Sequence, residues 1–255
     1  MTARPNQPGQ PPRTAQAITT DLAVPASALA IGAHPDDVEF GAGATLAKWA
    51  AAGCVVHHLV CTDGSKGTWD VHADTAALAR KRQAEQREAA RRLGATGEVV
   101  FLGETDGELT NDLARRGRVA EVIRRLRPEV VLGHDPWKPY RLHPDHRHAG
   151  QLACDAVVAA RDPHFFPEHR RPAHRPALLL LWEAAAVHHV EDVSGFVDTK
   201  LHALEAHASQ FESTMHATDE AMLERFRDEI RSRAAELGSP YGLGAAELFA
   251  HIDDL

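Results

Sequence analysis

Two short motifs, each with histidine and aspartate around a proline, carry the side chains of this chain that are best suited to chemistry. They are HPDD at residues 34–37 and HPDH at residues 143–146. In each motif the outer residues are three positions apart across a tight turn, so both side chains can point at one place. Two imidazoles and one carboxylate make a three-ligand set for a catalytic divalent ion and leave a coordination position for water. The motifs therefore predict a metal site.

The residues suggest different roles within the two motifs. His34 and Asp37 are both expected to be ligands, whereas spacing alone does not decide between His143 and His146. A bound divalent ion lowers the pKa of a coordinated water to about 7. Asp36 lies beside a ligand without being needed as one. We expect its carboxylate to accept the proton of that water, a step that typically contributes about 10²–10⁴-fold in rate.

Each motif alone also has a purely structural explanation. An aspartate that precedes a helix commonly caps free backbone N–H groups, which would account for Asp36 or Asp37. His-Pro-Asp turns are common as well. A functional site is favoured because both motifs occur in one chain and each follows a predicted strand.

Strands and helices alternate along most of the chain. We predict strands over residues 28–33, 54–61, 98–102, 129–133 and 177–182, and helices over residues 41–52, 75–93, 111–126 (with Asn111 as N-cap) and 145–161. This alternation predicts an α/β fold with a Rossmann-like open, mostly parallel sheet and helices on both faces. Beyond residue 194 we predict helices only, over 194–211 and 219–237. An extended segment and a short helix are expected over 238–255.

The predicted strands are followed by polar segments that belong at one edge of the sheet. In open parallel sheets, ligands bind beyond the carboxyl ends of the strands. Four successive strands are followed by acidic or imidazole groups, namely HPDDVE (34–39), TDGSKG (62–67), ETDGE (104–108), and HD (134–135) with the second motif. A solvated loop set would also be acidic, but it would not concentrate histidine beside paired aspartates.

The composition limits the class of protein. The 255 residues are 44% hydrophobic and carry a net charge of −8, which predicts one globular domain over 26–255, with 194–255 as its helical C-terminal part, after a mobile tail over 1–25. An acidic chain without a dense Lys/Arg block is a poor nucleic-acid binder. No apolar stretch approaches the ~20 residues that a membrane helix needs. Three distant cysteines indicate reduced thiols and a cytoplasmic location.

With both motifs in place, the chain resembles the LmbE/PIG-L family of zinc-dependent N-deacetylases, which act mostly on molecules that contain N-acetylglucosamine. The resemblance spans about residues 29–210 and includes the softer features TDG (62–64), Arg82 to Gly94, Asp106-Gly107 and HASQ (207–210). The stretch DGSKGTWD (63–70) is similar to the actinobacterial branch that acts in mycothiol metabolism.

The resemblance implies roles for individual residues. Zn²⁺ would be bound by His34, Asp37 and His146, although Fe²⁺ or another divalent ion suits the same ligands. Asp36 would be the general base, and His143 would be the electrophilic partner and general acid, oriented by Asp145.

It also implies contacts with the substrate. Arg82 and Asp106 match positions that face the sugar in relatives, although Arg82 on its own could equally be one charge on a solvated helix face. Some relatives carry a tyrosine two residues before the first histidine of the second motif, whereas here Tyr140 precedes His143 by three. The 134–142 loop is expected to shape the sugar pocket, where Trp137 or Tyr140 would either stack on a ring or pack the loop.

The expected function is metal-assisted hydrolysis that removes an acyl (acetyl) group from an N-acetylglucosamine-containing small molecule or glycoconjugate. An amidase of the mycothiol S-conjugate type is an alternative. A non-catalytic sugar-binding module with a vestigial metal site is disfavoured, because binding alone has no use for the pair Asp36 and His143. The resemblance does not identify the substrate. It is compatible with a homo-oligomer, because relatives often self-associate.

Two other classes of protein share part of the pattern. Gly41 and Gly43 follow a strand, and Asp63 lies about twenty residues later, as in dinucleotide-binding proteins; but the third fingerprint position is Leu46, and the acidic first motif would repel a pyrophosphate. Iron oxygenases with two histidines and one carboxylate use the same ligand types. They are usually β-barrels, which the alternation of strands and helices disfavours.

Overall fold

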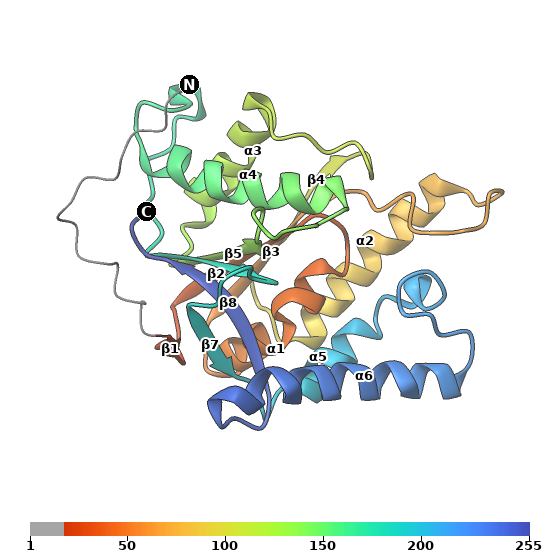
Figure 1. The fold of residues 1–255 in the computed structure, drawn as a ribbon. Helices are drawn as coiled ribbons and strands as arrows, with labels where there is room; N and C mark the ends of the chain where they lie inside the picture. The colour runs from red at the N-terminus through yellow and green to blue at the C-terminus, as the bar shows by residue number, and fades with distance from the viewer. Residues whose placement is uncertain (1–17) are drawn as a thin grey trace, which may run out of the picture.

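One eight-stranded sheet runs through the centre of the protein (Figure 1). The structure, a computed structural model, describes residues 18–255. The strands in chain order are β1 (Thr19–Thr20), β2 (Ser27–Gly32), β3 (Val55–Thr62), β4 (Val99–Glu104), β5 (Val130–His134), β6 (Leu178–Trp182), β7 (His189–Asp192) and β8 (Ala246–Ile252). Their order across the sheet is β1-β7-β8-β6-β5-β2-β3-β4. Strand β8 is antiparallel to both of its neighbours, and the other pairs are parallel.

Helices cover both faces of this sheet. They are α1 (Asp37–Ala51), α2 (Thr75–Arg92), α3 (Leu113–Leu126), α4 (Pro144–Arg161), α5 (Val197–Leu204) and α6 (Glu220–Gly238), with short 3₁₀ turns η1 (Pro167–His169), η2 (Ala208–Gln210) and η3 (Ser239–Tyr241). Helices α3 and α4 lie on one face, and α1, α2 and α5 lie on the other (Figure 1). The predicted α/β fold is therefore confirmed.

The central strands show why the sheet is covered on both sides. In β2, Leu29 and Ile31 point into the core under α3 and α4. The alternate residues, Ala28 and Ala30, point into the core under α1. A strand that is apolar on both faces gains stability only when both faces are covered, which is the usual situation in parallel sheets. The alanines leave room for α1 to approach β2 closely.

The C-terminal part differs from the sequence-based prediction. Helices α5 and α6 form, although α5 is shorter than predicted, but the expectation of helices only beyond residue 194 is wrong. The expected extended segment is strand β8, which inserts between β6 and β7 and pairs with both. The expected short helix is the turn η3, which precedes β8. Because β8 pairs with strands far away in the chain, its own seven residues contain no signal for where it docks.

The N-terminal segment also differs from the prediction. Residues 1–17 of the expected mobile tail lie outside the described residues, but for residues 18–25 the prediction is wrong, because β1 pairs in parallel with β7. Charged groups fix this segment. Lys48 Nζ on α1 lies 2.5 Å from Asp21 Oδ1 and 2.8 Å from Glu191 Oε2. The same buried Glu191 accepts a hydrogen bond of 3.0 Å from the backbone N–H of Leu22.

The helix ends follow the sequence signals with one local change. Helix α3 begins at Leu113, and its N-cap is Asp112 rather than the expected Asn111, since Asp112 Oδ1 accepts the N–H of Arg115 at 2.9 Å. Gly53 has a φ of 98°, a backbone conformation that lets glycine end a helix without steric cost. Among residues 18–255, none of the helices combines the length and hydropathy that crossing a bilayer would take.

The arrangement of four central strands positions the functional residues. Strands β5, β2, β3 and β4 are adjacent and parallel. The loops that follow them therefore meet at one edge of the sheet, as predicted.

Candidate metal centre and active site

Two histidines and one aspartate converge at this edge. Nδ1 of His34 lies 3.2 Å from Nε2 of His146. Asp37 Oδ2 lies 3.4 Å from His34 Nδ1, and Asp37 Oδ1 lies 3.3 Å from His146 Nε2. Ligand atoms of a tetrahedral zinc ion with bonds of about 2.0–2.1 Å are separated by about 3.3–3.4 Å. The donor set and its spacing therefore fit a tetrahedral divalent ion.

Asp37 is oriented by two donors on the same oxygen. It is the first residue of α1, and its Oδ2 accepts the backbone N–H of His34 at 2.7 Å. Oδ2 also lies 3.2 Å from Nε2 of His134. Burial alone would raise the pKa of Asp37, but the imidazoles of His146 and His134 outweigh burial and hold that pKa well below its usual range. The carboxylate is thus ionised, as a metal ligand must be.

Asp36 is held in a strained backbone conformation beside the three candidate ligand residues. Its φ is 108°, a left-handed value that costs a non-glycine residue about 1–3 kcal/mol. Although Asp36 precedes α1, its side chain accepts no capping hydrogen bond, so the structural explanation of the motif does not account for it. Burial raises the pKa of Asp36 to about 6, while the charge of Arg82 acts in the opposite direction.

Arg82 lies behind Asp36 rather than in open solvent. It is 3% exposed, and its Nη2 lies 3.2 Å from Asp36 Oδ2. The guanidinium also donates to the carbonyl oxygens of Pro35 at 2.6 Å and Gly64 at 2.9 Å. The protein itself thus satisfies most of the donors of this side chain, which ties the first motif to the loop after β3.

Gln86, one turn further along α2, supports the same motif. Its Oε1 accepts the backbone N–H of Asp36 at 2.9 Å, and its Nε2 donates to Glu39 Oε1 at 2.8 Å. Glu39 Oε2 in turn lies 3.3 Å from Nε2 of His207. All three supporting side chains are fully buried. The sequence analysis gave Gln86 no role; its only signal was its place in the soft Arg82–Gly94 feature of the family resemblance.

His143 and Asp145 are arranged differently from the expectation. His143 is the N-cap of α4, and its Nδ1 accepts the backbone N–H of Asp145 at 3.3 Å. The carboxylate of Asp145 instead lies 3.1 Å from Nε2 of His34 and accepts the N–H of Gly107 at 2.6 Å. The backbone of Asp145 therefore orients His143, and its side chain orients His34. The reason is local: the first turn of α4 points this carboxylate at the loop after β4.

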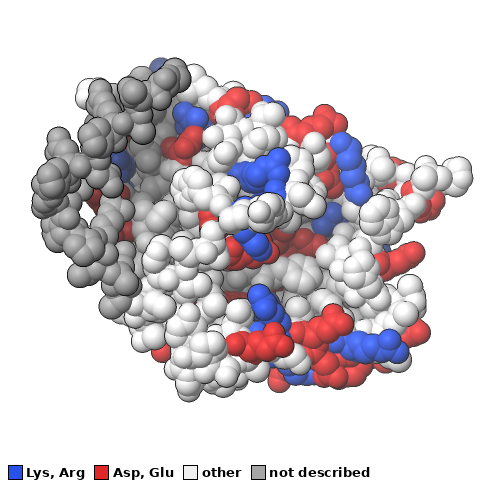
Figure 2. Space-filling model, viewed as in Figure 1, with Lys and Arg blue, Asp and Glu red and all other residues white. Residues whose placement is uncertain are grey.

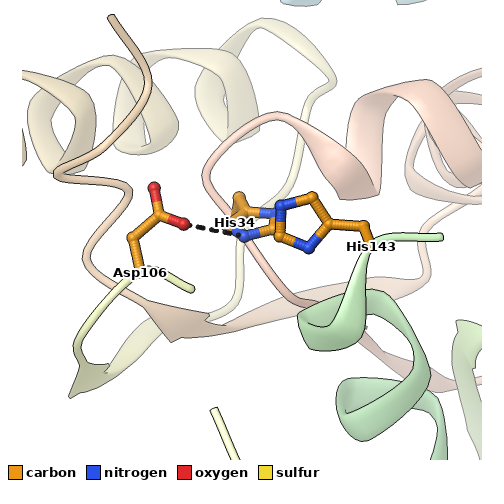
Figure 3. A group of neighbouring side chains, drawn as sticks. All are labelled: His34, Asp106 and His143. Atoms are coloured by element: carbon orange, nitrogen blue, oxygen red, sulfur yellow. Dashed lines mark ion pairs between the residues drawn. The ribbon is translucent and has the colours of Figure 1, made fainter. Parts of the chain in front are cut away.

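The imidazole of His34 lies between the predicted residues Asp106 and His143 (Figure 3). Asp106 Oδ1 is 3.2 Å from His34 Nε2, and Asp106 Oδ2 accepts the N–H of Lys66 at 3.0 Å. The rings of His34 and His143 are edge to face with centroids 4.6 Å apart. Burial and the neighbouring imidazoles of His34 and His146 lower the pKa of His143. His143 is therefore neutral near pH 7.

Tyr140 is the one predicted site residue that lies apart from the others. Its side chain is 96% exposed, and that of Trp137 is 65% exposed. Neither residue is among those that line the cavity at the site. Lys138 of the same loop does line it and lies 3.1 Å from Glu183 Oε1. The loop thus turns its aromatic side chains outward.

His134 contributes a contact that the sequence analysis did not assign. Its Nδ1 lies 3.0 Å from Nε1 of Trp182 and 3.2 Å from Nη1 of Arg141. Both of these groups can only donate, so Nδ1 accepts and the ring proton of neutral His134 is on Nε2, which faces Asp37. Burial lowers the pKa of His134 despite that carboxylate. The signal in the sequence was its position directly after strand β5.

These residues line one cavity of about 910 Å³. The predicted site residues that face it are His34, Asp36, Asp37, Arg82, Asp106, His143 and His146. Figure 2 shows charged side chains of both signs around a hollow in the middle of the face in view. Loops after four strands and helix α2 therefore form a candidate metal centre. The carboxylate of Asp36, which makes no capping hydrogen bond, lies beside it.

The fold and the site define an α/β protein with a candidate catalytic metal centre at the carboxyl edge of its sheet. The chain belongs to the PIG-L family (GlcNAc-PI de-N-acetylase), whose match spans residues 29–157. This confirms the resemblance seen in the motifs. The two rival classes fail on structure, because Gly41 and Gly43 lie inside α1 rather than before it, and because the sheet is open rather than a barrel.

Similar proteins include diacetylchitobiose deacetylase of Thermococcus kodakarensis, which is 36% identical over 187 residues, 72% of this chain and 69% of that protein. A 1D-myo-inositol 2-acetamido-2-deoxy-alpha-D-glucopyranoside deacetylase of Geodermatophilus obscurus is 34% identical over 63% of this chain and 59% of its own length. The solved structure of N,N'-diacetylchitobiose deacetylase from Pyrococcus horikoshii, complexed with its inhibitor MPG, has a TM-score of 0.81 and 29% identity, and the alignment covers 90% of this chain and 84% of that one.

The His134 contact leads to a prediction about metal affinity. Trp182→Phe removes the closer of the two donors that hold the Nδ1 of His134 as an acceptor and leaves only Arg141, so the Nε2 proton is held less firmly toward Asp37. Loss of such an outer contact typically costs about 10–100-fold in metal affinity. Competition for Zn²⁺ with a chromophoric chelator measures this loss, and ¹⁵N NMR of the His134 ring reports the change of tautomer.

Trp49→Phe is the matched control. Trp49 is also fully buried, but its Nε1 has no hydrogen-bond partner within the described part of the chain. Trp49→Phe therefore removes the same atoms as Trp182→Phe without removing a hydrogen bond. Equal zinc affinities in the two variants would show that Trp182 does not act through His134.

Proposed function

We propose that the protein is a zinc-dependent N-deacetylase that hydrolyses the acetamide of a small molecule or glycoconjugate containing N-acetylglucosamine. The observation that carries the proposal is the convergence of His34, Asp37 and His146 beside Asp36. The backbone of Asp36 is strained, and its carboxylate makes no capping hydrogen bond. The deacetylase names of the similar proteins support an N-acetylated amino sugar as the substrate.

His34, Asp37 and His146 would hold the ion. Zn²⁺ suits two nitrogens and one oxygen in a tetrahedral arrangement, and Fe²⁺ suits the same donors. When bound, the ion polarises the amide carbonyl and makes a water molecule acidic enough to lose its proton near neutral pH.

Asp36 would move the proton. Its carboxylate accepts a proton from the water as the water oxygen bonds to the carbonyl carbon, and later gives this proton to the amine nitrogen as the C–N bond breaks. The acid product keeps the second proton of the water and releases it on ionising at neutral pH. The amine takes up a proton, so the final products are a carboxylate and an ammonium ion. A pKa of about 6 suits this task, because the group is mostly ionised at pH 7 and is still a useful base.

His143 would stabilise the negative charge that develops on the carbonyl oxygen. Its Nδ1 accepts from the backbone of Asp145, so the proton of the neutral ring is on Nε2 and can be donated to that oxygen. Because the pKa of His143 is lowered, we propose a neutral hydrogen-bond donor here rather than the protonated imidazole of a general acid.

The alternatives are distinguished by the substrate. Amine release from a panel that contains N-acetylglucosamine, diacetylchitobiose, a glucosaminyl-inositol and a mycothiol S-conjugate, with protein of known metal content, separates the deacetylase from the conjugate amidase. Release from none of them would favour the sugar-binding module. The cytoplasmic location and the homo-oligomer remain predictions from the sequence.

Substitution of the base tests the mechanism. Asp36→Asn should lower the turnover number by about 10²–10⁴-fold, because the amide accepts no proton. Asparagine tolerates the left-handed backbone at this position better than most residues do, so the fold and the bound zinc should be kept. Amine release, circular dichroism and zinc content by mass spectrometry measure these three properties.

Two further variants serve as comparisons for Asp36→Asn. His146→Gln should lose zinc and activity together, whereas Glu108→Gln, which removes an exposed carboxylate on the same rim, should keep both. Wild-type turnover in zinc-loaded Asp36→Asn would exclude Asp36 as the base.

Arg82 should control the pH dependence of the reaction. Its charge lowers the pKa of Asp36, so Arg82→Met raises that pKa further. The base is active only when it is ionised, and the acid limb of the kcat/KM profile should therefore move to higher pH. Arg82→Lys keeps the charge, and its acid limb should stay closer to that of the wild type.

Arg80→Met serves as the control, because Arg80 is on the same helix and is exposed. Its profile should match that of the wild type. An acid limb in Arg82→Met that coincides with the wild-type limb would mean that the titrating group is not Asp36.

A further inference from the structure

The cavity at the metal centre has two parts of opposite chemical character. One part is polar and is lined by Lys66, Gly67, Asp106, Gln210 and Thr214. The other part, called the apolar arm here, is lined mainly by Phe40, Val187, Val197, Ile230, Ala234 and Leu237. The total volume of about 910 Å³ is near the upper end of the roughly 300–1,000 Å³ that is typical of small-molecule sites. One N-acetylated sugar does not need both parts.

The apolar arm begins at the proposed metal ligands and follows α1. Asp37 and Phe40 lie before a kink in this helix at Ala42, where φ is −146°, and Ala44 lies after it. All three line the cavity on the face that α1 turns toward it. The small side chain of Ala44 leaves space on this face of α1. The reacting carbonyl and the apolar arm are thus continuous.

Helix α6 forms the opposite wall. Three apolar residues at four-residue spacing along this helix, Phe226, Ile230 and Ala234, differ in their surroundings. Phe226 is buried and packs edge to face against Phe40 with ring centroids 6.1 Å apart. Ile230 and Ala234, about one and two turns further on, are only partly buried and line the cavity. Apolar side chains that remain accessible inside a cavity mark a place for an apolar ligand group.

The charged groups along this arm are already paired. Lys200 Nζ lies 2.7 Å from Glu247 Oε1 and donates to the carbonyl oxygen of Phe40 at 2.8 Å. Glu247 Oε2 accepts the N–H of Thr45 at 2.8 Å. Arg233 has an exposed side chain, as expected for the rim. Few free polar groups therefore remain in the arm for the hydroxyl groups of a sugar.

We propose that the apolar arm binds an apolar chain of the substrate. The preferred substrate is then an amino sugar that carries a medium-length alkyl group, either as its N-acyl chain or as its glycosidic aglycone, with the sugar in the polar part. This inference rests on the proposed function, because it places the scissile amide at the metal centre. The release of water from several methylene groups supplies the affinity.

Three substrates test the proposal with zinc-loaded protein. They are N-acetylglucosamine, N-octanoylglucosamine, and the octyl glycoside of N-acetylglucosamine, each below its critical micelle concentration. We expect at least one octyl substrate to have a KM that is lower by a factor of about ten or more. A gain for N-octanoylglucosamine assigns the arm to the acyl chain, and a gain for the octyl glycoside assigns it to the aglycone. A KM that falls for neither would overturn the proposal.

A pair of neighbouring alanines provides matched variants. Ala234→Glu introduces a charge into the apolar arm, whereas Ala235 is exposed on α6 and is not among the residues that line the cavity. The octyl advantage should be lost in Ala234→Glu. It should be kept in Ala235→Glu, whose hydrolysis of N-acetylglucosamine should match that of the wild type. An octyl advantage that survives in Ala234→Glu would place the alkyl group elsewhere.

Direct binding separates this inference from the proposed function. If no substrate releases an amine, the proposed function fails. Calorimetric binding of the octyl glycoside to the wild type but not to Ala234→Glu would still support the apolar arm, and absence of binding would refute it. If light scattering shows that Ala234→Glu only dissociates an oligomer while KM is unchanged, the arm is a contact between copies of the chain and the proposal is wrong.

Discussion

The imidazole of His34 is the interaction on which the rest of the site depends. Its Nε2 lies between the carboxylates of Asp106 and Asp145, so its proton is held on that side. Nδ1 is left to face His146, a residue 112 positions away in the sequence. Burial lowers the pKa of His34, but the three surrounding aspartates, Asp37 included, outweigh burial and raise that pKa well above its ordinary value. In the absence of an ion the ring therefore holds a second proton, which an incoming cation displaces, and metal affinity rises with pH.

The protein maintains this concentration of charge by surrounding it with fixed donors. Four buried carboxylates in one site would be costly without partners, and each of them receives hydrogen bonds from backbone N–H groups or from basic side chains. Asp36 differs from the others, since its backbone is strained and its side chain caps nothing. Gln86 and Arg82 hold it in place. Strain at one residue within a well-supported shell is the pattern expected where geometry serves function rather than stability.

Local patterns in the sequence were sufficient for most of the fold and for the centre of the site. The central strands are short apolar runs that end in polar loops, and the rule that parallel strands bind ligands at their carboxyl edge brought HPDD and HPDH together. Features that depend on non-local contacts were not predictable. Strand β8 pairs only with distant strands. The orientation of Asp145 toward His34 and of Tyr140 toward solvent depends on the path of two loops, and the role of His134 depends on donors from Trp182 and Arg141.

The central claim is that two proline turns from distant parts of the chain hold one divalent ion through two imidazoles and one carboxylate. X-ray absorption spectroscopy at the zinc edge of the zinc-loaded protein tests it most directly. The account predicts one zinc per chain, with only nitrogen and oxygen neighbours at about 2.0–2.1 Å and the outer-shell scattering of two imidazoles. A sulfur neighbour at about 2.3 Å, scattering from fewer than two imidazoles, or a spectrum unchanged in His146→Gln would contradict it.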